Sequence, residues 1–457
     1  MSINKEHFFQ QFAQQALDER VSLFLGAGGS CDVGYPTWKS LFTPFAEVLK
    51  TPIDESTDYY RLAQYYANEF GIGELRKRIN ESVNKNLHKS KLLEELLKVG
   101  FSNIWTTNFD NAIEMSYQQE NILTNKIFRD ADFSNIDIQK RVNIFKMNGD
   151  VTNLEGIVAT QSDYECYEDS HRVMLTFFKR ELISSTFLFI GYSFTDHLVL
   201  ECLSEIRRYL GESATYHYAI MKKDLDNKYF DYFIKDLEKR YNIRVLLVDT
   251  YEEIPAVLAE LNARIRSKRV FVSGAFSSHD METENFSHML SKELSSKLLK
   301  KDYRIVNGIG RRFGTHLIGY ANEHLAKEGV KNIDRHLIVK PFVGKGDQST
   351  EEKRRAREKV IGLCGAAVFV FGDRDRNSTS IRSGVLEEFE IACEQSKIVI
   401  PISYPGMASE EIWATVKKYI TRFPYLEKEI DHLTSQEPVD NLTNIIVHIL
   451  DSMQESM

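Results

Sequence analysis

The chain has 457 residues, which at roughly 150 residues per domain predicts two or three domains. Hydrophobic residues make up 42% and charged residues 27% of the sequence, a balance that excludes an intrinsically disordered or collagenous protein. No apolar run approaches the ~20 residues of a membrane span, and the first residues lack the apolar stretch of a signal peptide. The net charge of −8 argues against a dedicated nucleic-acid binder.

The cysteines and histidines bear on the compartment and on metal binding. None of the five cysteines forms a CxxC pair, so the paired-cysteine type of zinc site is absent from the sequence. A disulfide framework is not expected in a large chain without an export signal. The twelve histidines are scattered and form no HExxH motif. We therefore expect a cytoplasmic protein that requires no metal and binds neither nucleic acid nor membrane.

The first half of the chain alternates amphipathic stretches with short apolar runs. A helix is predicted over residues 7–18, and the apolar run Val21–Leu25 that follows predicts a strand. Residues 57–98 are predicted to be mostly helical and to form an inserted helical module; the paired tyrosines there, including Tyr59 and Tyr60, are interpreted as packing residues. Further β-branched and aromatic runs predict strands at 103–105, 142–145, 187–190, 216–220 and 244–248.

The same alternation restarts after a predicted helix over residues 251–267. Strands are predicted at 270–272, 303–306, 336–339, 367–370 and 398–400. Strands alternating with helices are typical of parallel sheets with crossover helices. We therefore predict an α/β chain of two Rossmann-like parallel-sheet domains, residues 1–267 and 268–457, the first with the inserted helical module.

Glycine-rich or polar turns follow four of the strands predicted in the first half. Ligands of open parallel sheets bind outside the carboxyl ends of the strands, and glycines there let the backbone approach a pyrophosphate. Taken singly, each turn is equally well or better explained as a tight turn or a helix cap, but four in this order indicate a ligand site. The four turns are Gly26-Ala27-Gly28-Gly29-Ser30, Thr106 to Asp110, Lys146 to Asp150, and Gly191 to Asp196.

This order of turns resembles the sirtuin family, which carries GAG-x-S, T-x-N-x-D, K-x-H-G-D and G-x-S motifs. The resemblance implies a domain that cleaves NAD+ to nicotinamide and ADP-ribose. Asn108 would then hydrogen-bond the nicotinamide ribose or the attacking water, and Asp110 would brace its turn. The NAD+ contacts implied by the matching positions are Gly26, Ala27, Gly28, Ser30, Tyr35, Thr107, Asp110, Gly191 and Ser193.

One position departs from the sirtuin pattern, because Asn148 stands where the family has its catalytic histidine. Histidine accepts a proton near neutral pH, whereas an amide only donates and accepts hydrogen bonds. We therefore expect reduced activity with Asn148 at the catalytic position. Two explanations remain open, an engineered variant or a natural, weakly active member; the intact residues around Asn148 favour the first.

The second half contains a further set of candidate ligand residues. Ser273-Gly274 and Gly308-x-Gly310 follow predicted strands, although structural turns explain them equally well. A basic run that includes Arg357 is typical of a solvated helix face, yet an arginine fork also grips phosphate and a carboxylate accepts ribose hydroxyls. This half is similar to SLOG domains, which bind nucleotide-derived signals. The ligand contacts that this resemblance implies are Ser273, Gly274, Gly308, Gly310, Arg357, Arg374 and Glu388.

The two halves together resemble the Thoeris-type antiphage effectors, in which a sirtuin-like domain is fused to a SLOG domain. The resemblance implies an NAD+ hydrolase that is activated when a cyclic ADP-ribose isomer, made by a TIR-domain partner, binds the SLOG domain. It also implies a homo-oligomer, a tetramer. Two alternatives stay open: an NAD-dependent deacylase, against which the missing cysteine pairs argue, and a non-catalytic nucleotide sensor, which Asn148 favours.

Overall fold

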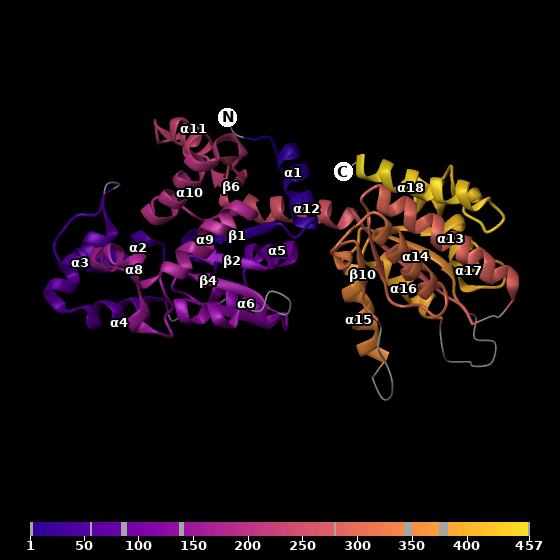
Figure 1. Cartoon of the computed structure of the whole chain (residues 1–457), viewed down its shortest axis with the longest axis horizontal. Helices are drawn as coiled ribbons and strands as arrows, with labels where there is room; N and C mark the ends of the chain where they lie inside the picture. Colours follow the sequence, from indigo (N-terminus) through magenta and orange to yellow (C-terminus); the bar gives the residue numbers. More distant parts are fainter. Residues whose placement is uncertain are drawn as a thin grey trace. The chain divides into compact units, whose positions relative to one another are not determined.

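The computed structural model describes residues 3–54, 57–83, 89–136, 141–277, 280–341, 350–373 and 383–455. They form two compact units, the first ending at Asn262 and the second beginning at Ala263, inside helix α12 (Ile254–Ser267) (Figure 1). Each unit contains one parallel sheet with helical connections. The predicted fold class is therefore confirmed.

The first unit is built on a seven-stranded sheet of order β3-β4-β2-β1-β5-β6-β7. Its central strands β1 (Val21–Leu25) and β5 (Thr186–Ile190) are buried at every position, as expected of strands covered on both faces. The other strands are β2 (Asn103–Thr106), β3 (Thr124–Ile127), β4 (Val142–Lys146), β6 (His217–Lys222) and β7 (Ile243–Val248). The helices outside the inserted module are α1 (Lys5–Leu17), α2 (Trp38–Val48), α6 (Ala112–Gln119), α7 (Gln161–Glu165), α8 (Tyr167–Ser170), α9 (Arg172–Ser184), α10 (His197–Leu210) and α11 (Phe230–Tyr241).

Strand β3 is the one strand of this sheet that we did not predict. It lies at the edge and pairs with β4 on one side. Its residues Thr124, Asn125 and Lys126 are partly exposed, and only Ile127 is buried. An edge strand needs no continuous apolar run, so the apolar pattern on which the other strands were predicted is missing here.

The predicted helical module is confirmed between β1 and β2. It consists of α3 (Tyr59–Phe70), α4 (Ile72–Val83) and α5 (Lys91–Val99). Asp58 caps α3 by accepting hydrogen bonds from the backbone N–H groups of Tyr60 and Arg61. The helix packs on α2, α4 and α7 and buries Leu62, Ala63 and Tyr66. This packing brings the first turn of α3 close to α7, which lies about a hundred residues further along the chain.

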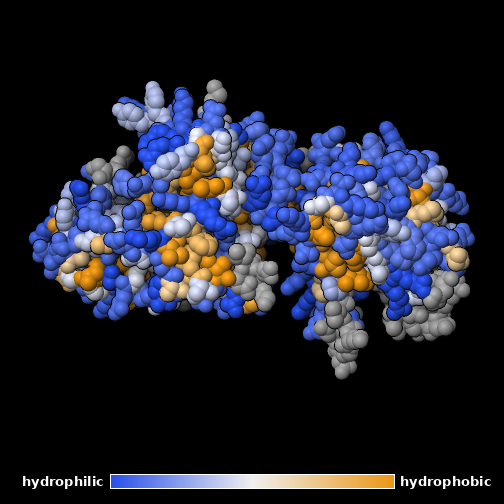
Figure 2. Space-filling view, viewed as in Figure 1, coloured by the Kyte–Doolittle hydropathy of each residue, from blue (hydrophilic) through white to orange (hydrophobic). Residues whose placement is uncertain are grey.

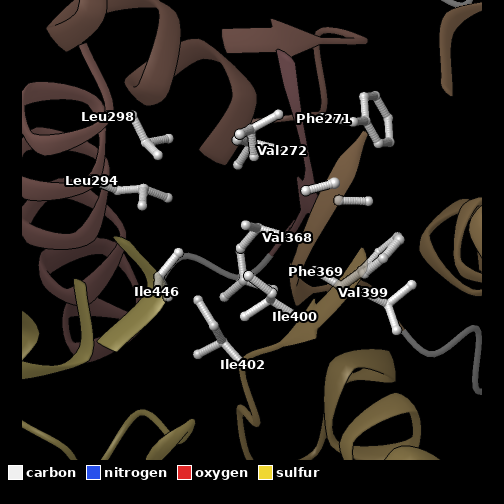
Figure 3. Close-up of a cluster of buried hydrophobic side chains, with 14 of the residues drawn as sticks. Phe271, Val272, Leu294, Leu298, Val368, Phe369, Val399, Ile400, Ile402 and Ile446 are labelled. Atoms are coloured by element: carbon white, nitrogen blue, oxygen red, sulfur yellow. The ribbon is translucent and has the colours of Figure 1, made fainter. Parts of the chain in front are cut away.

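The second unit contains a five-stranded sheet of order β10-β9-β8-β11-β12. Figure 3 shows that neighbouring residues of its strands point to opposite faces: Val272, Val368 and Ile400 face Leu294, Leu298 and Ile446, whereas Phe271, Phe369 and Val399 point the other way. The strands are β8 (Arg269–Ala275), β9 (Arg304–Asn307), β10 (Leu337–Val339), β11 (Ala366–Phe371) and β12 (Ile398–Pro401). The helices are α13 (Met281–Lys300), α14 (Phe313–Lys327), α15 (Thr350–Gly362), α16 (Gly384–Glu394), α17 (Ala408–Lys418) and α18 (Val439–Glu455).

The chain order reverses between β1 and β5 in the first unit and between β8 and β11 in the second; the first sheet has a further reversal at its edge, where β4 lies between β2 and β3. Open parallel sheets bind ligands at such a point, outside the carboxyl ends of the strands. The face of the molecule seen in Figure 2 is mostly hydrophilic, with apolar side chains in separate patches. None of the helices in the described part of the chain combines the length and apolar character that crossing a bilayer requires.

Candidate functional site

The turns that follow β1 and β5 are in direct backbone contact. The Gly26 N–H donates to the Ile190 carbonyl at 2.9 Å, and the Gly28 N–H donates to the Gly191 carbonyl at 2.9 Å. The chain then forms a short 3₁₀ helix over Ala27–Val33, in which Ser30 is buried while Ala27 and Gly28 are partly or fully exposed. The glycine-rich turn therefore lies at the point where the strand order reverses.

Asn108 is held against this turn by its amide nitrogen. Nδ2 donates to the Gly26 carbonyl and to Ser30 Oγ, both at 3.2 Å. A carbonyl can only accept, so these contacts determine which end of the amide is the nitrogen. The opposite atom, Oδ1, is buried and has no hydrogen-bond partner among the described residues. Asn108 thus presents an unused acceptor at the carboxyl end of β2.

Asn148 follows β4, the strand that pairs directly with β2. Its side chain is only 1% exposed, and neither amide atom forms a hydrogen bond of normal geometry with the described residues. A buried polar atom without a partner costs about 1–3 kcal/mol, and native proteins contain few of them. Three buried amide atoms therefore lack hydrogen-bond partners at the ends of two adjacent strands. They indicate a site where a polar ligand or water supplies the missing hydrogen bonds.

A buried charge cluster connects the turns that carry Asn108 and Asn148. Lys146 Nζ donates to Asp150 Oδ2 at 2.5 Å and to the carbonyls of Phe109, at 3.1 Å, and Asp110. Burial acts to lower the pKa of Lys146, but the carboxylates of Glu114, Asp150 and Asp110 outweigh it and raise the pKa above its usual value. We assigned no role to Lys146 or Asp150 from the sequence, although both belong to the third turn.

The carboxyl group of Asp150 carries a pH dependence of stability. Burial acts to raise its pKa, but Lys146 and Lys126 outweigh burial and lower it to about 2 from 3.8. A carboxylate whose pKa is depressed on folding stabilises the fold above its unfolded pKa and loses that contribution as the pH falls toward 2, here about 2 kcal/mol. Urea unfolding of the parent chain and of Asp150→Asn between pH 6 and pH 2.5 measures this contribution to the free energy of unfolding. We expect the variant to be less stable at pH 6 and to lose less stability on acidification; parallel curves would contradict this.

The remaining predicted NAD+ contacts are distributed between the buried cluster and the surface. Asp110 Oδ1 accepts from the Ala112 N–H at 2.9 Å and from Ser30 Oγ at 3.5 Å, which holds the turn together. Tyr35 is buried beside it, and burial followed by the charge of Asp110 raises the pKa of Tyr35 to about 12. Thr107 is buried. Ser193 is exposed and its hydroxyl pairs with that of Thr195 at 2.8 Å.

Three elements of the second unit bring predicted ligand residues together. Ser273 Oγ, in β8, donates to Glu388 Oε2 of α16 at 2.5 Å. Arg357, on α15, donates to Glu388 Oε1 at 3.3 Å and to Glu387 Oε2 at 2.6 Å. Burial raises the pKa of Glu388, opposed by Ser273 and Arg357. A phosphate that binds Arg357 would therefore have to compete with two carboxylates.

Gly310 has a steric role in this site. A Cβ atom on Gly310 would lie 2.0 Å from the carbonyl oxygen of Gly274, so the turn after β9 can pack on β8 only without a side chain. Gly308 lies in the same turn and is partly exposed. Arg374 falls outside the described residues.

A second polar cluster in this unit consists of Glu284 and His288 on α13 with His316 on α14, whose ligand atoms lie within 4.8 Å of one another. The two imidazole rings stack with centroids 3.9 Å apart, and Arg312 donates to the Glu284 carboxylate at 2.9 Å. The guanidinium places a positive charge beside the carboxylate that would receive a cation. We interpret the cluster as an ion-paired contact between the two helices.

Comparison with known proteins identifies the family of each unit and of the whole chain. Residues 102–246 match the family described as SIR2-like domain, and residues 253–453 match the Sir2- and TIR-associating SLOG family. The protein named NAD(+) hydrolase ThsA from Bacillus cereus (strain MSX-D12) is 30% identical, with 98% of each chain aligned. The chain belongs to the ThsA family. The relative of the same name from Enterococcus faecium is 29% identical over 99% of this chain and 100% of its own length, so the resemblance to ThsA extends over both units.

Proposed function

We propose that this ThsA-family chain hydrolyses NAD+ to nicotinamide and ADP-ribose in residues 1–267, and that a cyclic ADP-ribose isomer bound by residues 268–457 activates it. The relatives named NAD(+) hydrolase support the reaction. The observation that carries the proposal is the set of orphaned amide atoms of Asn108 and Asn148 beside the glycine-rich turn. A dinucleotide has hydroxyl groups for these atoms and a pyrophosphate for the turn.

The geometry accounts for binding and orientation. Cleavage of the nicotinamide–ribose bond passes through an oxocarbenium-like state, so the enzyme must hold the ribose and align a water opposite nicotinamide. The turn of Gly26, Gly28 and Ser30 would hold the pyrophosphate through its backbone N–H groups. Asn108 Nδ2 is already engaged, which leaves Oδ1 to accept from a ribose hydroxyl or from the water. Water is the acceptor in this proposal, and an acylated lysine is not required.

Asn148 makes this site slower than one with an imidazole at the same position. An amide cannot take the proton of the attacking water, and loss of a general base lowers rates ~10²–10⁴-fold. We therefore propose reduced NAD+ turnover for the chain as it stands, whether Asn148 is its native residue or an introduced one.

In the second unit we propose that Arg357 contacts a phosphate of the cyclic nucleotide and that Glu388 accepts a ribose hydroxyl. The ion pair between Arg357 and Glu387 and the hydrogen bond from Ser273 keep both groups in place before the ligand arrives. The family described as Sir2- and TIR-associating supports a TIR-domain protein as the source of the signal. Activation further requires that the ligand favour one arrangement of an assembly, for which we propose a homotetramer.

NAD+ consumption with and without cyclic ADP-ribose isomers tests this function in the full chain. We expect turnover that increases with the activating isomer and needs no acylated peptide. Arg357→Ala should weaken isomer binding, measured by calorimetry, at least tenfold and leave NAD+ affinity unchanged; Arg355→Ala, an exposed arginine on the same helix, is the matched control. Unchanged isomer affinity in Arg357→Ala would refute the assignment, and turnover only with an acylated peptide would indicate a deacylase.

A further inference from the structure

A chain of hydroxyl groups runs from the vicinity of Asn148 to a buried carboxylate. Tyr164 donates to Asp196 Oδ2 at 2.5 Å, and Tyr60 donates to the same oxygen at 3.1 Å. The two hydroxyl oxygens also lie within hydrogen-bond distance of each other, so the single proton of Tyr60 can be donated either to Asp196 or to Tyr164. The Tyr60 hydroxyl approaches the Asn148 amide, although not with normal hydrogen-bond geometry. We interpreted Tyr60 from the sequence as a packing residue, which leaves these contacts unexplained.

The three residues come from elements that are far apart in the sequence. Tyr60 lies on α3 of the inserted module, Tyr164 on α7, and Asp196 immediately before α10. The turn between β5 and α10 holds two residues with positive φ, Gly191 at 63° and Phe194 at 56°. A non-glycine residue in this conformation is strained, and such strain concentrates at functional sites. Asp196 lies two residues after Phe194, at the start of α10.

The two carboxylate oxygens of Asp196 accept different hydrogen bonds. Oδ1 accepts from the backbone N–H groups of Leu198 at 3.0 Å and Val199 at 3.4 Å and so caps α10. Oδ2 accepts from the tyrosines. Capping needs only one oxygen and is satisfied by many polar residues. The pair of partly buried tyrosines on the second oxygen is therefore not explained by the helix cap.

We propose that Tyr60, Tyr164 and Asp196 form the proton acceptor of the NAD+ hydrolase site, with Tyr60 at the substrate end and Asp196 as the final acceptor. The inference rests on the proposed function. As the water oxygen bonds to C1′ of the ribose, the C1′–N bond breaks and nicotinamide leaves with its electron pair. The water proton passes to Tyr60 Oη while the tyrosine proton moves to Asp196, directly or through Tyr164. The Asp196 proton returns to solvent after product release.

The dependence of kcat on pH should follow the ionisation of Asp196. Burial raises its pKa above the usual value for aspartic acid. The groups that interact with it are kept in their protonated, neutral form by burial, which raises the pKa of each: Tyr60, Tyr164, Tyr167, Tyr192 and Cys202. A base must be ionised to work, so kcat should rise with pH through the pKa of Asp196.

The experiment measures kcat, KM and the pH profile for NAD+ in the full chain and in three variants. Tyr60→Phe should lower kcat at least about 10²-fold with KM changed less than twofold. Asp196→Asn keeps an oxygen for the cap and should lower kcat similarly while removing the acidic limb of the profile. Tyr59→Phe makes the same chemical change one residue earlier, where the ring stacks on Phe42, and should leave kcat unchanged. Thermal unfolding of each variant checks the fold.

A second measurement separates this inference from the hydrolase assignment. In an Asn148→His background the imidazole takes the proton, so Tyr60→Phe should lower kcat less than fivefold, against the 10²-fold loss beside Asn148. The proposed transfer of the proton through Tyr60 and Tyr164 to Asp196, the tyrosine relay, would be overturned by an equal loss of kcat in both backgrounds. An unchanged kcat in Tyr60→Phe would overturn it as well. An inactive parent with an active Asn148→His variant would also overturn it and leave the hydrolase assignment standing. Inactivity of both would overturn both.

Discussion

An Asn148→His substitution is expected to raise kcat for NAD+ hydrolysis by about 10²-fold. The side chain is buried at the carboxyl end of β4, beside the end of β2 that carries Asn108, so a base there would lie next to the orphaned acceptor that orients ribose or water. A general base contributes ~10²–10⁴ in rate, and the lower end applies because the tyrosine relay already supplies part of that effect. Steady-state kinetics with saturating activator measure the change.

Asn148→Ala is the control for this substitution. It removes the amide without supplying a base and should not raise kcat above that of the parent. The histidine variant should also gain activity as the pH rises through about 6–7, because the imidazole must be neutral to accept a proton. Equal activity of the histidine and alanine variants would show that this position is not where the proton is accepted.

Gly191→Ala is expected to destabilise the first unit strongly. Its φ is +63°, and a Cβ atom would lie 2.1 Å from the Gly29 backbone nitrogen. The left-handed conformation costs an alanine about 1–2 kcal/mol, and overpacking against backbone adds about 1–3 kcal/mol. We therefore expect a loss of roughly 2–5 kcal/mol in the free energy of unfolding by urea, together with loss of NAD+ binding because the turn after β1 must move.

Gly100→Ala isolates the contribution of the close approach. Gly100 also has a left-handed backbone, at φ +84°, but open space surrounds the position of its Cβ atom. It should lose about 1–2 kcal/mol of stability and keep its affinity for NAD+. If the two alanine variants lost the same stability, contact between the turns after β1 and β5 would not be a constraint on the fold.

Most of the fold could be predicted because the strands are buried on both faces. Runs such as Val21–Leu25 and Thr186–Ile190 are apolar at nearly every position, and that pattern is visible without knowing their neighbours. The edge strand Thr124–Ile127 escaped prediction because an edge strand needs no such run. The polar turns at strand ends likewise indicated the carboxyl edge of the sheet, where Asn108 and Asn148 lie.

The pairing of individual side chains could not be predicted in the same way. The sequence identified Arg357 as a basic residue near a possible ligand. It did not reveal that Glu387 and Glu388 form ion pairs with it. The contacts among Tyr60, Tyr164 and Asp196 could not be predicted either, because we interpreted Asp196 as a turn residue and Tyr60 as a packing residue.

The sequence by itself determined the two parallel sheets, the order of the turns along them and the absence of a histidine at position 148, because burial periodicity and residue identity are local properties. Only the tertiary structure decided which atoms of those turns are already paired and which remain unsatisfied. It also brought Tyr60, which approaches Asn148, into contact with Tyr164 and Asp196. Such hydrogen bonds join residues more than a hundred positions apart, and their partners are chosen by the packing of helices on the sheet.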